Sequence, residues 1–292
     1  MSAVKNIVFI TNPASGTSVK KPGAQFIRSF FDESFKLSFF ETSKSGNACE
    51  LTSNAIHDGA DAVVAIGGDG TVNEIARTLN GTGCVLGILP CGSGNGLARH
   101  HGISLKMDSA IATIRKFKVI DHDAVSINGM LSFNVSGIGF DAHVAHLFGK
   151  NGNRGFSNYI KLVIREFYSY KEQKITVEFN NCEITQPVML AAFANGSQFG
   201  NNARIAPGAD TNDGIADIIL VRKMNTFRLP WFMYQVFNRQ VDNSDFSTLL
   251  RGDKFTIRCE NEMPLHIDGE PAGTSKNFVI QNLHSTLKLI IP

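Results

Sequence analysis

The chain has 292 residues, enough for two domains of ordinary size, and 43% of them are hydrophobic. A formal net charge of +2 without clustered lysine or arginine argues against a nucleic-acid partner and against a strong electrostatic membrane anchor. No stretch approaches the roughly 20 apolar residues of a transmembrane segment, and residues 6–10 are too short for a secretory signal, so a cytoplasmic protein is expected. Five cysteines without a CxxC pair indicate neither a zinc site nor a disulfide framework.

The first part of the sequence alternates predicted strands and helices. We expect strands at residues 7–10, 37–41, 63–66 and 85–89, and helices at residues 24–31, 48–57, 104–116 and from residue 71 onward. This order predicts a doubly wound, mostly parallel α/β sheet, whose ligands bind at the carboxyl ends of the strands. The polar loops after these strands should therefore converge on one crevice.

Residues 62–75 carry the strongest local signal. A buried strand ends at Gly67-Gly68-Asp69-Gly70, and Thr71 with Glu74 matches a capping box, so a helix should begin at Thr71. Glycines and a helix N-terminus suit a phosphate group, whereas the two acidic side chains require a cation such as nucleotide-bound Mg²⁺. A side chain in place of Gly68 should then block the phosphates and leave the fold intact. The same glycine turn is also compatible with an ordinary strand-to-helix connection.

The longer segment, residues 66–74, resembles the nucleotide-binding signature of the diacylglycerol kinase catalytic-domain family, which includes bacterial lipid kinases, sphingosine kinases and ceramide kinases. NAD kinases share part of this signature. The family's other nucleotide motifs follow in order, although the first of them also suits a plain turn and a lone threonine also suits a helix cap. The resemblance implies that ATP is bound by Asn12, Pro13, Ser15, Gly16, Thr42, Gly67, Gly68, Asp69, Gly70, Thr71, Asn73, Glu74, Gly92 and Ser93.

One position departs from the bacterial pattern. Bacterial members often carry Asn-Asp where this chain has Asn95-Gly96, and that Asp belongs to a network of water and magnesium. The Gly-Ser-Gly-Asn form is more similar to the loop of sphingosine and ceramide kinases. The departure leaves open how the metal network is completed and which lipid is the acceptor.

Short predicted strands dominate the second half of the sequence. They predict an antiparallel β-sandwich, and a boundary near residue 122 gives a nucleotide-binding domain, 1–122, and a substrate-binding domain, 123–292. The expected strands are residues 124–127, 131–135, 174–179, 188–194, 215–221, 254–258, 265–267, 278–280 and 287–291. Helices are expected at residues 158–170 and 230–238. The aromatic residues of the latter, including Trp231, should pack mainly in the core, with membrane contact as the alternative.

The candidate catalytic residues lie in this second half. Asp268-Gly269-Glu270 is compatible with a common hairpin turn, but it also matches the family's catalytic motif. The resemblance implies that Glu270 accepts the proton of the acceptor hydroxyl, with Asp268 as its partner or in the exchanged role. It also implies that Asp141 faces the acceptor hydroxyl, with a solvated loop acid as the alternative.

A structural magnesium site follows from the same resemblance. The carboxylate of Asp213 and the backbone carbonyls of Asp210 and Ile215 would supply hard oxygen ligands, which suit Mg²⁺. A simple turn before the strand at residues 215–221 is the competing interpretation.

Together these features predict an ATP- and Mg²⁺-dependent lipid kinase. This transferase would move the γ-phosphoryl group to a hydroxyl of a lipid such as diacylglycerol or a sphingoid base, acting from the cytoplasm at a membrane surface in phospholipid metabolism. The alternatives are an NAD kinase-like small-molecule kinase and a non-catalytic lipid- or nucleotide-binding protein. The sequence leaves the lipid, the regulation and homodimer formation open.

Overall fold

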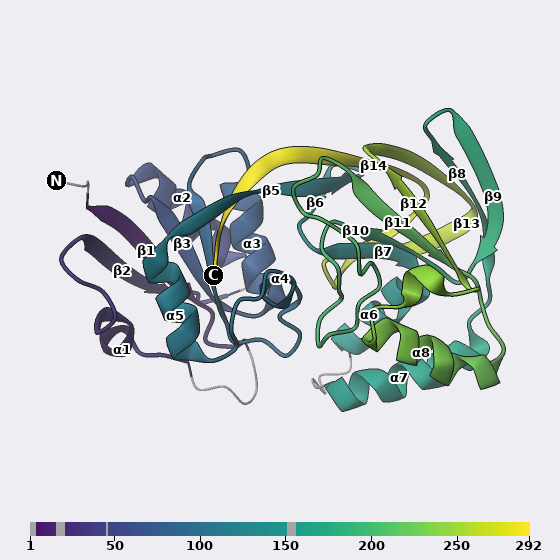
Figure 1. Ribbon diagram of the computed structural model, residues 1–292, viewed down its shortest axis with the longest axis horizontal. Helices are drawn as coiled ribbons and strands as arrows, with labels where there is room; N and C mark the ends of the chain where they lie inside the picture. The colour runs from purple at the N-terminus through teal and green to yellow at the C-terminus, as the bar shows by residue number, and fades with distance from the viewer. Residues whose placement is uncertain (1–3, 16–20, 45, 151–155) are drawn as a thin grey trace. The chain divides into compact units, whose positions relative to one another are not determined.

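The computed structural model describes residues 4–15, 21–44, 46–150 and 156–292 (Figure 1). The chain divides into two compact units, here called unit 1 (Met1–His122 with Ser285–Pro292) and unit 2 (Asp123–His284). The last residues therefore belong to unit 1, whereas the sequence assigned them to the second domain. The reason is strand pairing, because Lys288 and Leu289 lie parallel to Val85 and Leu86.

Unit 1 is built on a parallel sheet with the strand order β14-β4-β3-β1-β2. Every residue of β3 and β4 is buried, which explains why their sequences are continuous apolar runs rather than alternating ones. The doubly wound α/β prediction is thereby confirmed. The elements are β1 (Lys5–Thr11), α1 (Ala24–Arg28), β2 (Phe35–Glu41), α2 (Asn47–His57), β3 (Ala62–Gly67), α3 (Asp69–Leu79), β4 (Val85–Pro90), α4 (Gly96–His100) and α5 (Met107–Lys116).

The start of α3 differs from the prediction. The helix begins at Asp69 and its N-cap is Gly68, whose extended backbone (φ −96°, ψ −173°) precedes the first turn. Thr71 is therefore inside the helix, and its hydroxyl accepts a hydrogen bond from the side-chain amide of Asn12 instead of capping the helix. The capping-box interpretation of Thr71 and Glu74 was wrong because a glycine took the cap position. The short helix α4 was also missed.

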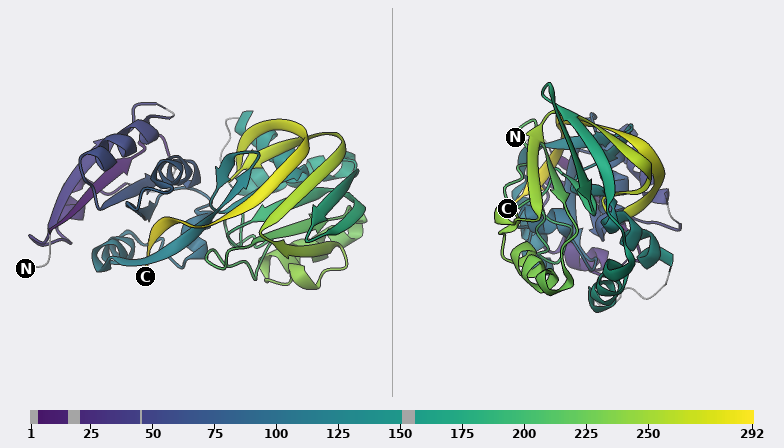
Figure 2. Two further views of the ribbon diagram at one scale, coloured as in Figure 1. Left: turned by 90° about the horizontal axis from the view of Figure 1, so that it is seen from above. Right: turned by 90° about the vertical axis from the view of Figure 1, so that its right-hand side faces the viewer.

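Unit 2 contains an antiparallel sheet with the strand order β12-β11-β10-β7-β13-β14 (Figures 1 and 2). Further strands extend it, because β8 pairs with β13 and β9, and β5 pairs with β14 and β6. Two strands, β5 and β14, contain residues of both units. The elements are β5 (Lys118–Ile127), β6 (Met130–Ser132), β7 (Val135–Gly139), α6 (Phe140–Lys150), α7 (Phe156–Ser169), β8 (Gln173–Phe179), β9 (Cys182–Val188), β10 (Leu190–Ala194), β11 (Ala216–Val221), η1 (Thr226–Arg228), α8 (Leu229–Phe237), η2 (Val241–Asn243), β12 (Ser247–Gly252), β13 (Lys254–Ile267) and β14 (Glu270–Ile291).

The core of unit 2 has two parts, one on each face of the sheet. Alternate residues of a strand point to opposite faces, so Phe193 and Ile218 join a cluster with residues of β5 and β8. Their neighbours Ala192 and Ile219 join a second cluster, which contains residues of α6, α7 and α8. The first cluster is the interior of the predicted β-sandwich, and the helices cover the other face.

Several predicted strands merge or shift in unit 2. Each of β13 and β14 unites two expected strands. The register of β13 shifts between Arg258 and Met263, and this irregularity interrupts the apolar alternation that sequence analysis relies on. The missed helix α6 begins at Phe140, so Asp141 lies in its first turn rather than in a loop. Strands β9 and β12 were also missed.

Candidate active site

The loops that follow β1, β2, β3 and β4 lie along one edge of the unit 1 sheet, because these strands run parallel. The loops after β3 and β4 touch through glycines. A Cβ atom built on Gly68 would lie 3.1 Å from the Cα of Gly92, and one built on Gly92 would lie 2.5 Å from the Cα of Gly68. The N–H of Cys91 also donates to the carbonyl of Gly67, at 2.8 Å. Glycine is therefore required here for the close approach of two backbone segments.

Asp69 connects the same two loops. Its carboxylate accepts hydrogen bonds from the backbone N–H groups of Asn95 (2.8 Å) and Gly96 (2.7 Å) at the start of α4. Glu74 similarly accepts from the N–H of Gly46 in the loop after β2, at 3.3 Å. Backbone donors of the protein thus stabilise both carboxylates, and the expectation that these acids require a cation beside a phosphate stays a prediction.

Asn12 connects the loop after β1 to the loop after β3. Its side-chain amide nitrogen donates to Thr71 Oγ1 at 3.1 Å, and its side-chain oxygen accepts from the N–H of Ala14 at 3.0 Å. The hydroxyl of Ser15 donates to the backbone carbonyl of Asn12 at 2.9 Å. The loops after all four strands thus form one hydrogen-bonded assembly, here called the loop edge.

The structure brings the remaining predicted nucleotide residues to this loop edge, with one exception. Thr42 and Asn73 are buried, whereas Pro13 and Ser93 are exposed. Gly70 lies in the first turn of α3. Gly16 falls outside the described residues.

Two cations at the loop edge were missed by the sequence analysis. The ammonium of Lys21 donates to the carbonyl of Pro13 at 2.6 Å, and the guanidinium Nε of Arg99 donates to the carbonyl of Gly94 at 3.1 Å. Neither residue belongs to a motif that the sequence analysis recognised. Only the folding of the loops brings their charged groups close to the glycines. Burial raises the pKa of the nearby Cys91 thiol, an effect that the charge of Lys21 opposes. A buried, protonated thiol of this kind fills space and is unsuited to a role as nucleophile.

The glycine contact makes a direct prediction about stability. Gly92→Ala should destabilise the protein by about 1–3 kcal/mol and weaken nucleotide binding, because the new methyl group would displace the backbone at Gly68. Thermal unfolding and calorimetric titration with ATP would measure the two effects. Gly23→Ala is the matched control, since no atom lies within 4 Å of a Cβ at Gly23 and its φ of −72° suits alanine. If Gly92→Ala and Gly23→Ala were equally stable, this result would contradict the close contact between Gly92 and Gly68. The same contact corrects the expectation that a side chain in place of Gly68 would leave the fold intact, because its Cβ would lie 3.1 Å from the Cα of Gly92.

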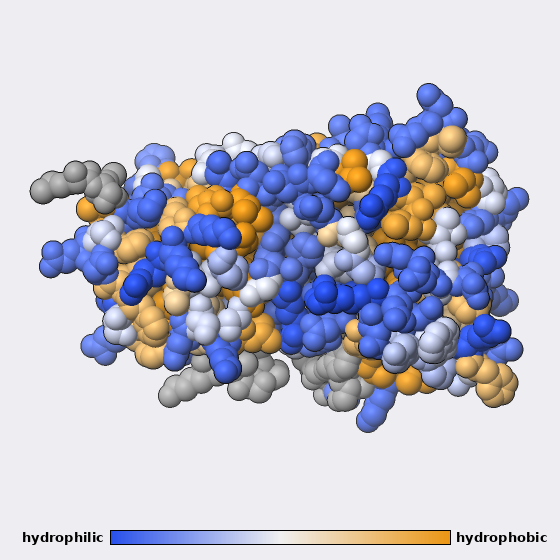
Figure 3. Space-filling view, viewed as in Figure 1, coloured by the Kyte–Doolittle hydropathy of each residue, from blue (hydrophilic) through white to orange (hydrophobic). Residues whose placement is uncertain are grey.

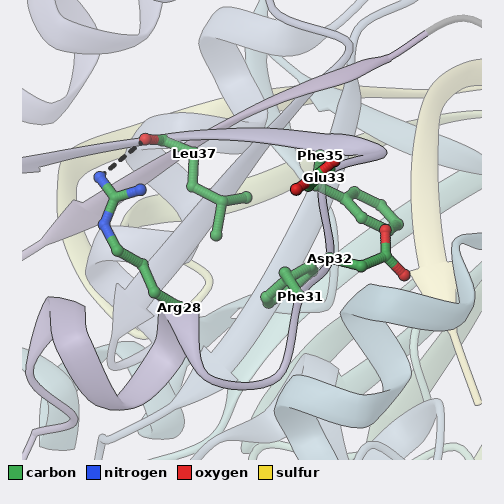
Figure 4. A pocket seen from close by; sticks show the side chains of 6 residues that line it. All are labelled: Arg28, Phe31, Asp32, Glu33, Phe35 and Leu37. Carbon is green, nitrogen blue, oxygen red and sulfur yellow. Dashed lines mark hydrogen bonds between the residues drawn. The ribbon is translucent and has the colours of Figure 1, made fainter.

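A separate pocket of unit 1 lies away from the loop edge. It is lined by Arg28 at the end of α1, by residues 31–33 of the connection to β2 and by the start of β2, and the guanidinium of Arg28 donates to the carbonyl of Leu37 across it at 3.0 Å (Figure 4). The pocket lies near the amino end of β2, whereas the loop edge follows the carboxyl ends of the strands. It is therefore no candidate for the nucleotide site.

In unit 2, Asp268 and Gly269 form a two-residue hairpin turn between β13 and β14, and Glu270 is the first residue of β14. Asp268 (φ 48°) and Gly269 (φ 89°) both have positive φ, as a type I′ turn requires. The carboxylate of Asp268 accepts hydrogen bonds from Ser132 Oγ (2.6 Å) and from the N–H groups of Phe133 (2.9 Å) and Asn134 (3.1 Å). Glu270, in contrast, is exposed. The two carboxylates therefore have different surroundings. The sequence alone did not reveal this difference.

Asp141 is connected to this turn through His266. Strand pairing places His266 opposite Gly137, and His266 Nε2 lies 3.1 Å from Asp141 Oδ2. The N–H of Gly269 donates to His266 Nδ1 at 3.0 Å, so Nδ1 is an acceptor and the proton of the neutral ring is on Nε2, which donates to Asp141. Asp141 Oδ1 accepts from the N–H of Ala142 at 2.8 Å. His266 was missed by the sequence analysis, although it lies two residues before Asp268.

The predicted magnesium ligands lie in the loop before β11. Asp210 and Asp213 are exposed, and Asp213 Oδ1 accepts from the N–H of Ile215 at 3.1 Å. The carbonyl of Ile215 accepts from the side-chain amide of Asn282 at 2.9 Å. A carbonyl oxygen has a second lone pair, so the donor set remains compatible with Mg²⁺. Within the described residues, no group of three His, Cys, Asp or Glu side chains could hold a metal ion by themselves.

The parallel α/β unit with its glycine loops and the antiparallel unit with its carboxylates define a two-domain protein of the kinase-like α/β plus β-sandwich class. The family profile described as diacylglycerol kinase catalytic domain matches residues 6–127. The profile described as YegS C-terminal NAD kinase beta sandwich-like domain matches residues 134–290. The chain therefore belongs to the diacylglycerol kinase family, in its form with a YegS-type C-terminal domain.

Individual relatives cover most of the chain at low identity. A probable lipid kinase YegS-like protein of Chromohalobacter salexigens is 28% identical and covers 86% of this chain and 82% of that protein. A diacylglycerol kinase of Bacillus subtilis is 23% identical and covers 99% of this chain and 97% of that protein. The crystal structure of a putative diacylglycerol kinase from Bacillus anthracis superimposes with a TM-score of 0.80 at 20% identity, covering 99% of this chain and 95% of that one. This structural likeness supports the fold.

Proposed function

We propose that the protein is an ATP-dependent lipid kinase that phosphorylates a hydroxyl of diacylglycerol or of a sphingoid base. The observation that carries the proposal is the hydrogen-bonded connection from Asp141 through His266 to the hairpin turn directly before Glu270. Transfer of a phosphoryl group to an alcohol needs a positioned carboxylate that accepts the hydroxyl proton. At this turn the carboxylate of Glu270 is exposed, whereas those of Asp268 and Asp141 are held by hydrogen bonds.

The proposal assigns the nucleotide to the loop edge of unit 1. Backbone N–H groups near glycines approach phosphates closely, and Lys21 and Arg99 supply positive charge. The acceptor hydroxyl is assigned to unit 2. There Glu270 is proposed as the proton acceptor, because the carboxylate of Asp268 already accepts three hydrogen bonds. Asp141 is proposed to orient the hydroxyl.

Mg²⁺ is proposed as a cofactor with two tasks. Bound to the nucleotide it would neutralise charge on the phosphates, and in unit 2 the carboxylate of Asp213 with the carbonyls of Asp210 and Ile215 would hold a structural ion. The cytoplasm is proposed as the location, with transient membrane contact during the reaction. Among the described residues, no helix has the length and apolar character needed to cross a bilayer.

The decisive experiment incubates the purified protein with labelled ATP, Mg²⁺ and a panel of acceptors. Vesicles containing diacylglycerol, vesicles containing a sphingoid base, and soluble NAD are offered separately, and the labelled product is identified. We expect a phosphorylated lipid whose formation requires vesicles or micelles. Robust phosphorylation of NAD without vesicle dependence would support an NAD kinase-like enzyme instead. Tight ATP binding with no turnover on any acceptor would support a non-catalytic binding protein.

The structural magnesium ion makes a prediction that is independent of activity. Mg²⁺ at about 100 times its Kd should stabilise the protein by about 2.7 kcal/mol and raise Tm by several degrees, because the ion binds only the folded loop. Asp213→Asn should remove this rise, whereas Asp58→Asn, at an exposed position of unit 1, should keep it. A thermal shift titration in the absence of nucleotide measures the effect. An identical rise in Asp213→Asn would refute the assignment of that carboxylate.

A further inference from the structure

Residues 222–241 form a basic segment of unit 2 that contains no aspartate or glutamate. Its charged side chains are those of Arg222, Lys223, Arg228 and Arg239. The segment includes η1 and the nine-residue helix α8. Such a combination of a short apolar helix and basic residues is typical of protein segments that lie at a membrane interface.

Helix α8 has two apolar faces with different environments. Leu229, Phe232 and Val236 are buried in the core of unit 2, as the sequence analysis expected. A second set is exposed and is here called the aromatic face: Phe227 (91% exposed), Trp231 (52%) and Tyr234 (48%). Trp231 and Tyr234 are three residues apart in α8, a spacing that places side chains on one side of a helix, and Phe227 lies in η1 directly before α8. The expectation that the aromatic residues here serve mainly the core is thus correct for only one face.

The geometry of the aromatic face is defined. The rings of Trp231 and Tyr234 are stacked, with centroids 5.2 Å apart and planes 16° apart. Trp and Tyr are enriched where an apolar phase meets water, because their rings are amphipathic. The stacked pair and the almost fully exposed Phe227, four residues before Trp231, present apolar surface that water solvates poorly.

The end of α7 adds further exposed apolar side chains next to this segment. Ile164 is 46% and Tyr168 is 60% exposed. The ammonium of Lys223 donates to the carbonyls of Tyr168 (3.2 Å) and Tyr170 (2.5 Å), which holds the end of α7 beside the start of the basic segment. Figure 3 shows hydrophobic residues along the lower edge of unit 2, where Figure 1 draws α7 and α8.

Positive charge accompanies the aromatic face at both ends. Arg222 and Arg228 precede α8 and are exposed, and exposed Arg239 follows it. Burial lowers the pKa of Arg204, and the positive charge of Arg239 lowers it further. An anionic group placed near these guanidinium groups would be attracted to them.

We propose that the aromatic face of α8 docks on a membrane surface that contains anionic lipid. The aromatic rings enter the region between headgroups and acyl chains, and the surrounding arginines bind anionic headgroups. The biological purpose of this docking rests on the proposed lipid kinase function, because it would bring unit 2 to its substrate. The binding itself requires no catalysis, so the two proposals can fail separately.

Trp231 is the only tryptophan of the chain and therefore reports on this surface directly. The full-length protein is mixed with vesicles of phosphatidylcholine alone or with phosphatidylglycerol added, and tryptophan emission is recorded. Docking predicts a blue shift, quenching by brominated acyl chains, and tighter binding to the anionic vesicles. Emission that stays unchanged with both vesicle types would overturn the proposal, as would binding without quenching by brominated lipid.

A variant that retains the probe tests the contribution of the aromatic face. Phe227→Ser should weaken vesicle partitioning about tenfold or more, because the change removes a large apolar side chain that the membrane would bury. The matched control is Phe40→Ser, which removes an exposed phenylalanine (46%) from β2 of unit 1. Equal weakening in both variants would overturn the assignment to α8. A concentration-dependent dimer in sedimentation that disappears in Phe227→Ser would overturn it in favour of a second copy of the chain.

Activity assays separate this proposal from the proposed function. Phe227→Ser should lower turnover of diacylglycerol in vesicles while leaving turnover of a water-soluble, short-chain diacylglycerol unchanged. If the wild type binds vesicles through Trp231 but phosphorylates no lipid, the docking surface stands and the kinase function fails. If lipid in vesicles is phosphorylated equally well by Phe227→Ser, the kinase function stands and the docking surface is wrong.

Discussion

Replacing Glu270 by Gln should lower turnover by about 10²- to 10⁴-fold, the usual contribution of a general base. The amide cannot accept the hydroxyl proton, yet it keeps the size of the side chain. Because Glu270 is exposed, the variant should unfold at the wild-type temperature and bind ATP with wild-type affinity. Steady-state kinetics with the accepted lipid, together with calorimetric ATP titration, would measure these effects.

Asp268→Asn provides the comparison, because the structure gives this carboxylate a different task. It accepts hydrogen bonds from Ser132 and from two backbone N–H groups, and an amide can accept only part of these bonds. The variant should lose about 1–3 kcal/mol of stability in addition to activity. If Asp268→Asn were inactive but fully stable while Glu270→Gln kept near-wild-type turnover, the two roles would have to be exchanged.

Asp141→Asn should produce the second large effect. The carboxylate accepts from the N–H of Ala142 and from His266 Nε2, so an Asn that keeps its oxygen toward one donor turns its NH₂ group toward the other. The ring of His266 would then lose its partner, and its hydrogen bond to Gly269 in the hairpin turn would shift. We expect turnover to fall by about 10²-fold or more, with a loss of stability of about 1–3 kcal/mol.

Nitrogen NMR of the histidine rings gives a readout that a general loss of stability would not produce. In the wild type His266 should carry its proton on Nε2, and Asp141→Asn should change this signal. His57→Gln is the control for replacement of an exposed histidine ring, since the side chain of His57 is 90% exposed, and it should leave both turnover and the His266 signal unchanged. A wild-type His266 protonated on Nδ1 would contradict the proposed connection.

The α/β class of unit 1 and its glycine loops could be predicted from sequence because the responsible signals are local. An apolar run such as β3, followed at once by glycines and a polar helix, specifies strand, turn and helix within about a dozen residues. The predicted positions of helix and strand ends were less accurate. Gly68 and Thr71 both qualify as an N-cap in sequence, and in the structure Gly68 is the cap while the hydroxyl of Thr71 bonds to Asn12 from another loop.

The partners of the acidic residues could not be predicted, because they are set by contacts between distant segments. His266 meets Asp141 across 125 residues of sequence, through the register of β13 against β7. A shift of that register by one residue would turn His266 to the opposite face of the sheet. Asp69 likewise finds the backbone of Asn95 and Gly96 only after β3 and β4 are aligned in parallel.

The sequence by itself determined the α/β and β-sandwich architecture and the glycine loops, since periodicity and turn chemistry report local geometry, whereas the acidic motifs were recognised only through the family resemblance. Only the tertiary structure decided which carboxylate is held by hydrogen bonds and which is exposed, and which face of α8 is buried and which is left to solvent. The physical reason is that burial and hydrogen-bond partners depend on how distant segments pack, and the composition of a segment does not contain that information.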